Sequence, residues 1–130
     1  AFVSHSTFGQ PLTSRTKHIR SAVEILKEKK VDFEFDGDMQ PDVALNPEYE
    51  ELYPFSKIVG KANILIMPGQ HSAAISYKLM KTIGDTKVIG PLLIGLGLPI
   101  EIAPLRSSTS EIINLASIAA YSADVIDYSK

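Results

Sequence analysis

A chain of 130 residues has the length of one ordinary domain or of part of a larger one, and its apolar fraction of 45% is typical of a folded soluble core. The net charge of −2 gives no electrostatic case for binding nucleic acid or an anionic membrane surface. The absence of cysteine excludes disulfides, thiolate metal sites and a cysteine nucleophile; it also fits a reducing compartment, so we expect a cytoplasmic protein.

The chain opens on strand-like residues without an initiator methionine, so we expect a fragment excised from a longer protein. Its first residues lack the basic segment followed by an apolar one that makes a signal peptide. The longest apolar stretch, residues 88–100, is interrupted by glycines and prolines and is too short to span a bilayer. We therefore expect no membrane partner.

Strand patterns alternate with helix patterns along the whole sequence. The predicted strands are residues 1–5, 32–35, 63–67, 87–95 and 99–103. The predicted helices are residues 14–30, 42–53 in two pieces broken near Pro47, 70–83, and 108–124. This alternation predicts an α/β fold with a largely parallel sheet flanked by helices.

Arg106 stands just before the run that predicts the last helix. Ser108 and Glu111 have the spacing of a capping box, which places the start of that helix after Arg106. A guanidinium beside the free N–H groups of a helix N-terminus makes a good phosphate site. The segment adds hydroxyls at Ser108 and Thr109 but no histidine or cysteine, and its one carboxylate is committed to the cap. The sequence therefore predicts a site that holds a phosphorylated ligand, with no catalytic residue.

A second candidate for phosphate binding is the loop after the first predicted strand. Its residues Ser6, Thr7 and Gly9 offer hydroxyls and backbone N–H groups, which can cradle an anion. The loop has no Walker lysine, so it is not a P-loop. An ordinary polar connection is the simpler interpretation of this loop taken alone, and both interpretations stay open.

The sequence predicts no metal site. His5, His18 and His71 fall on three different predicted elements, and none has a second ligand at metal-binding spacing. His18 is expected to face solvent, and His5 to line the crevice beside Ser6. Asp36 and Asp38 could bind a divalent cation, but the spacing does not continue as a calcium loop, so a turn followed by a solvated helix face is the favoured interpretation of this acidic stretch.

Several segments, in this order, resemble the phosphate acetyl/butyryl transferase family. The resemblance covers nearly the whole chain, residues 1–130. It rests on residues 6–9, 36–44, 62–68, 77–79, 89–92 and 105–106, of which the runs Asp36–Gln40 and Ala62–Ile66 are specific when found together. It implies a phosphotransacetylase-like fold of the isocitrate/isopropylmalate dehydrogenase-like kind. The segment Asp42–Pro47 most resembles the C-terminal domain of the large bacterial NADP-dependent malic enzymes.

Two departures from the family pattern concern catalysis. Active phosphotransacetylases have a serine directly before the arginine and an aspartate, the general base, six residues after it. Here those positions are Leu105 and Ile112, whereas Arg106 matches the arginine that faces phosphate and CoA. Leucine cannot hydrogen-bond a thiol and isoleucine cannot accept its proton, so the resemblance implies a kept anion site without the base.

The resemblance implies a regulatory and oligomerisation domain of an NADP-dependent, oxaloacetate-decarboxylating malic enzyme, which converts malate to pyruvate and CO2. Acetyl-CoA would be its effector, bound without acyl transfer. NADP and a divalent metal would belong to the upstream malic enzyme domain. The partners would be that domain and further copies in a homo-oligomer, a dimer or higher, which the nearly all-round apolar last helix also suits. Two alternatives stay open, namely an active phosphate acyltransferase and a purely structural dimerisation module.

Overall fold

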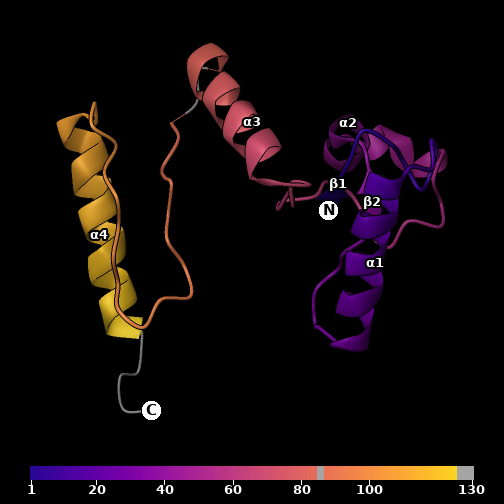
Figure 1. Ribbon diagram of the computed structural model, residues 1–130, viewed down its shortest axis with the longest axis horizontal. Helices are drawn as coiled ribbons and strands as arrows, with labels where there is room; N and C mark the ends of the chain where they lie inside the picture. Colours follow the sequence, from indigo (N-terminus) through magenta and orange to yellow (C-terminus); the bar gives the residue numbers. More distant parts are fainter. Residues whose placement is uncertain (85–86, 126–130) are drawn as a thin grey trace. The chain divides into compact units, whose positions relative to one another are not determined.

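The computed structural model describes residues 1–84 and 87–125, and it divides the chain into two compact units, Ala1–Leu79 and Met80–Lys130 (Figure 1). Each unit is described by itself. In the part of the chain that the structure describes, no helix is long and apolar enough to cross a membrane.

The first unit is built on a small parallel sheet. Strand β1 (Phe2–Val3) pairs in parallel with β2 (Gly37–Met39), and Phe2 also forms a parallel bridge to Ile66. The backbone of β1 therefore has neighbours on both sides, because Ser4 N donates to the Met39 carbonyl and Val3 N donates to the Ile66 carbonyl. The expected α/β class with a parallel sheet is confirmed, although the sheet is smaller than predicted.

Helix α1 (Ser14–Glu28) covers the sheet and carries the apolar face that the sequence predicts. Val23 on this face is buried, and its neighbours Ile19, Ala22 and Leu26 are half-buried. Thr13 caps the helix by accepting from Thr16 N, while the fully buried Thr16 hydroxyl accepts from Thr13 N. These reciprocal bonds satisfy two backbone donors at the helix start.

The hydrophobic core of this unit is formed by residues of the sheet and by residues that follow β2. Val3, Met39, Ala44 and Ala62 are its buried members. The predicted two-piece helical segment is confirmed as α2 (Pro41–Leu45) followed by the 3-10 helix η1 (Pro47–Glu51), and the break comes at Asn46 and Pro47. Asn46 caps η1 by accepting from Glu48 N.

Helix α3 (Gln70–Ile83) has the predicted bounds, and Gly84 follows it with its N–H donating to the Met80 carbonyl. Helix α4 (Thr109–Val125) is the last element of the second unit and also agrees with its prediction. Leu115 is its one buried residue among those described, and apolar side chains such as Ile112 and Ile113 are exposed.

Three strand predictions are wrong. Residues 32–35 are irregular, and β2 begins at Gly37 because the backbone of β1 pairs with residues 36–39 instead. Within the described residues, 87–95 and 99–103 form no strand. Positive φ angles at Gly90 and Gly95 break up the first of these segments, and an apolar run does not say where a pairing partner lies. Residues 63–67 contribute only the bridge at Ile66.

Gly37 is the position at which the pairing of β1 and β2 tolerates no side chain. Its φ is +152°, and a Cβ atom there would lie 2.6 Å from the Phe2 carbonyl oxygen. That oxygen belongs to the backbone of β1, so relief requires the two strands to separate.

We predict that Gly37→Ala lowers the free energy of unfolding by about 2 kcal/mol or more, because it combines a backbone clash with an unfavourable φ. Gly69→Ala is the matched control, since a Cβ there meets no atom within 4 Å. Urea unfolding of both variants measures the difference. Equal stability of the two variants would contradict the close approach of the strands.

Candidate functional site

The segment around Arg106 forms a turn that leads directly into α4. Ser107 N donates to the Pro104 carbonyl at 3.0 Å, and α4 begins two residues later at Thr109. Leu105 and Arg106 are both exposed on this turn. The guanidinium therefore stands one turn before the helix, as the sequence predicts.

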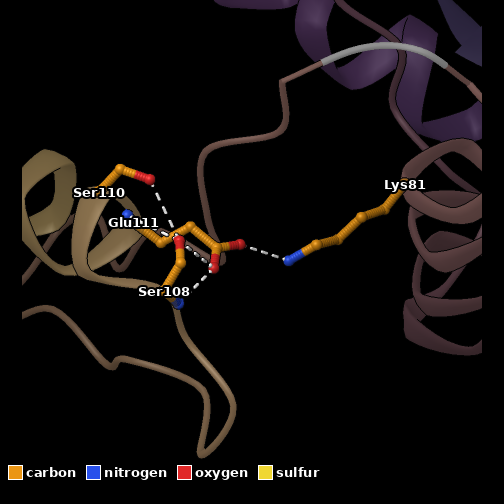
Figure 2. Close-up of polar contacts among 4 residues, drawn as sticks. All are labelled: Lys81, Ser108, Ser110 and Glu111. Carbon is orange, nitrogen blue, oxygen red and sulfur yellow. Dashed lines mark hydrogen bonds and ion pairs between the residues drawn. The ribbon is translucent and has the colours of Figure 1, made fainter.

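The predicted capping box is confirmed at the start of α4 (Figure 2). The Ser108 backbone N donates to Glu111 Oε2 at 2.8 Å, and Glu111 N donates in return to Ser108 Oγ at 3.3 Å. The Ser108 hydroxyl also contacts Glu111 Oε2 at 3.0 Å and Ser110 Oγ at 3.1 Å. Both the backbone N–H and the hydroxyl of Ser108 thus form hydrogen bonds within the protein.

Lys81 completes this cluster from α3. Its Nζ lies 2.6 Å from Glu111 Oε1, and Figure 2 shows the carboxylate held between the lysine and Ser108. The hydrogen bond from Lys81, followed by those from the Ser108 backbone and hydroxyl, lowers the pKa of Glu111 from 4.5 to about 2. This carboxylate is therefore an internal anion that already occupies part of the positive end of α4.

Arg106 remains available to an external anion. Among the residues that the structure describes, it forms no ion pair. Thr109 is also exposed at the start of the helix, whereas Ser108 is committed to the cap. Arg106 and Thr109 are thus the predicted ligands that the local geometry leaves open, and binding by either of them stays a prediction.

The two positions at which the resemblance leads us to expect catalytic side chains, Leu105 and Ile112, are apolar and exposed. Leu105 is fully accessible, and Ile112 on the first turn of α4 is 50% exposed. Neither side chain can donate or accept a proton. The carboxylate closest in sequence, Glu111, is unsuited to act as a general base because a pKa of about 2 makes it weakly basic.

The loop with Ser6, Thr7 and Gly9 belongs to the other compact unit, and its polar groups serve the protein itself. The buried Ser6 hydroxyl donates to Asp38 Oδ2, and Gly9 N donates to the same oxygen at 3.4 Å. Thr7 Oγ1 accepts from Gln40 N. These contacts favour the interpretation of the loop as a structural connection, and its role in phosphate binding stays a prediction.

Residues Gly37–Met39 form strand β2, which corrects the interpretation of this run as a turn. The carboxylates of Asp36 and Asp38 both accept hydrogen bonds within the protein. Asp36 accepts from Gly37 N at 2.9 Å and from Lys57 N at 2.8 Å, and both aspartates are buried. Among the described residues, no group of three or more histidine, aspartate or glutamate side chains is arranged to hold a metal ion.

The histidines are the residues whose arrangement the sequence did not reveal. His5, His18 and His71 come from three elements, yet all three line one open hollow of the first unit, together with Arg15. His18 is exposed, as the sequence predicts, and it also lines this hollow. The sequence contains one signal of this arrangement, which is the position of each histidine in its element. His5 follows a strand, while His18 and His71 lie near the starts of helices.

We predict that the contribution of Glu111 to stability depends on pH in the acid range. Because its pKa is lower in the folded chain than the ordinary 4.5, the stabilisation is fully present above pH 4.5 and is lost as pH falls towards 2. NMR titration of the Glu111 side chain measures this pKa directly, and Lys81→Met should raise it. Lys87→Met, which removes an exposed cation outside the cluster, is the control, and an equal effect of both variants would contradict the assignment.

Comparison with known proteins finds one family over most of the chain. Residues 1–120 match the family described as phosphate acetyl/butaryl transferase. An NADP-dependent malic enzyme from Rhizobium meliloti is 49% identical over 95% of this chain, and the phosphate acetyltransferase of Bacillus subtilis is 34% identical over 92%. The EutD phosphotransacetylase structure from Staphylococcus aureus superimposes with a TM-score of 0.83 at 29% identity over 94% of the chain.

The chain spans only a part of each of these relatives. It covers 16% of the length of the Rhizobium malic enzyme, where it matches a C-terminal segment. It covers 38% of the Bacillus phosphate acetyltransferase and 38% of the EutD chain. The fold is therefore phosphotransacetylase-like over the region compared.

Proposed function

The chain belongs to the phosphate acetyl/butaryl transferase family, and on this basis we propose that it is a non-catalytic segment of a malic enzyme that senses acetyl-CoA through Arg106. The parent protein would be an NADP-dependent, oxaloacetate-decarboxylating malic enzyme that converts malate to pyruvate and CO2. NADP and the divalent metal would bind in its upstream domain. This segment would regulate that domain and hold the homo-oligomer together in the cytoplasm.

The names and identities of the relatives support the malic enzyme assignment over a free-standing transferase. Malic enzymes from Rhizobium meliloti and Rickettsia prowazekii are 49% and 41% identical to this chain. The Bacillus phosphate acetyltransferase reaches 34%. These similarities connect the chain to proteins in which it would be a small terminal part.

The observation that carries the proposal is an exposed Arg106 next to the start of α4 that forms no ion pair among the described residues. The two positions at which the family pattern expects catalytic side chains are the apolar Leu105 and Ile112. An arginine without a carboxylate partner attracts phosphate, which acetyl-CoA carries. Leu105 and Ile112 supply no base, so binding would not lead to transfer. A site of this kind can act as a sensor if acetyl-CoA binds more tightly to one state of the enzyme than to another.

Two other functions compete with this one. An active phosphate acyltransferase fits the family and the Bacillus relative, but Leu105 and Ile112 count against it. A purely structural dimerisation module fits the exposed apolar side chains of α4, such as Ile113 and Tyr121. For substitution of Arg106, each alternative predicts a result different from the one that the acetyl-CoA sensor predicts.

We predict that Arg106→Ala weakens acetyl-CoA binding by about 1.5–3 kcal/mol, or roughly 10- to 150-fold, because a charge-assisted hydrogen bond is lost. Arg106→Lys keeps the charge but lacks the planar guanidinium. Its affinity for acetyl-CoA should therefore lie between those of the unsubstituted protein and the Arg106→Ala variant. The measurement is calorimetry on a malic enzyme that has this sequence as its C-terminal segment, with malate-dependent NADP reduction followed in parallel.

Lys87→Gln is the matched control, since it removes another exposed cation of the second unit. Unchanged affinity of the Arg106→Ala protein would reject the site. Absence of acetyl-CoA binding in the unsubstituted protein would favour the structural module.

We predict that the same protein forms no acetyl phosphate from acetyl-CoA and phosphate. The double variant Leu105→Ser, Ile112→Asp restores the side chains of active relatives and tests whether they alone are missing. A measurable rate in the unsubstituted protein would revive the acyltransferase alternative, because that protein lacks the base the reaction is expected to need.

A further inference from the structure

An open hollow of about 700 Å³ lies in the first unit between the end of β1 and the starts of α1 and α3. His5 lines it from the segment after β1. Arg15 and His18 line it from the first turns of α1, and His71 lines it from the first turn of α3. We call this feature the histidine hollow.

The lining of the histidine hollow includes a cationic side chain and no acidic one. Its lining contains one arginine and three histidines and no aspartate or glutamate. Arg15 forms no ion pair within the part of the chain that is described. Both α1 and α3 present their N-terminal turns here, and the partial positive charge of a helix start adds to that of the side chains. An anion is therefore favoured at its rim.

The remaining lining is largely apolar. Val3, Ile19, Met67 and Ile75 are among its members, together with Pro41 and Pro68. A volume of this order is typical of sites for small organic ligands, which combine an apolar surface with a few polar groups that fix orientation. Inorganic phosphate alone would leave the apolar part of the hollow uncovered.

The spread of the histidines argues against a single metal ion. They line the same hollow, yet the described residues contain no group of three or more potential ligands close enough to hold one metal. Even a neutral imidazole keeps one N–H donor, so histidines around a rim can each contact a different oxygen. This pattern suits an extended anion with several acceptor oxygens.

We propose that the histidine hollow binds a phosphorylated organic molecule of nucleotide size. Its phosphate oxygens accept hydrogen bonds from Arg15 and the surrounding histidines, and its organic part covers the apolar lining. The proposal does not depend on acetyl-CoA binding at Arg106, which belongs to the other compact unit.

Calorimetric titration of the intact protein with ADP tests the proposal, with adenosine and pyrophosphate as the two partial probes. ADP should bind more tightly than either part, and its affinity should fall with added salt. Arg15→Gln should weaken ADP binding about tenfold or more, and His71→Gln by several-fold. These side chains are exposed, so thermal unfolding should show that both variants remain folded.

Two controls separate this site from other cations. Lys17→Gln removes an exposed charge from the same helix outside the lining, and Arg106→Gln removes the arginine of the other unit. Both should bind ADP within about twofold of the unsubstituted protein. The proposal is overturned if ADP does not bind, if Arg15→Gln binds as tightly as Lys17→Gln, or if only Arg106→Gln loses binding.

Discussion

A fully buried carboxylate, that of Asp38, ties the loop after β1 to the end of β2 by accepting from Ser6 Oγ and Gly9 N. The Asp38 carbonyl accepts from Phe8 N as well, so the loop is anchored through both backbone and side chain. Leaving a buried polar group without its hydrogen-bond partner typically costs about 1–3 kcal/mol, so loss of the Ser6 hydroxyl would destabilise this loop.

In the second unit, too, a carboxylate accepts hydrogen bonds from groups of the chain, but this one lies at the surface. Glu111 accepts from Ser108 and pairs with Lys81, so an internal carboxylate satisfies the helix start and neutralises one cation. Asp38 in the first unit and Glu111 in the second are engaged within the protein, while Arg15 and Arg106 lack acidic partners among the described residues. Anion binding would then fall to these arginines rather than to the hydroxyl-rich loop.

Local patterns predicted the helices well because their signals lie within each segment. The apolar period of α1 and the Ser108–Glu111 capping box are properties of neighbouring residues. The strands depend on a partner, so alternation over residues 32–35 pointed to the wrong segment and β2 lies at Gly37–Met39. The histidine hollow was missed for a similar reason, since only the fold brings His5, His18 and His71 around one space. The isocitrate/isopropylmalate dehydrogenase-like label stays a prediction.

Hydrogen exchange of a malic enzyme that has this sequence as its C-terminal segment, measured with and without acetyl-CoA, is the most direct test of sensing at Arg106 because it reports where the ligand acts on the backbone. If this chain senses acetyl-CoA at Arg106, the amides at the start of α4, from Ser107 to Ile112, exchange more slowly when acetyl-CoA is present. Protection elsewhere in the protein with none across this segment would contradict the claim that this chain senses acetyl-CoA at Arg106.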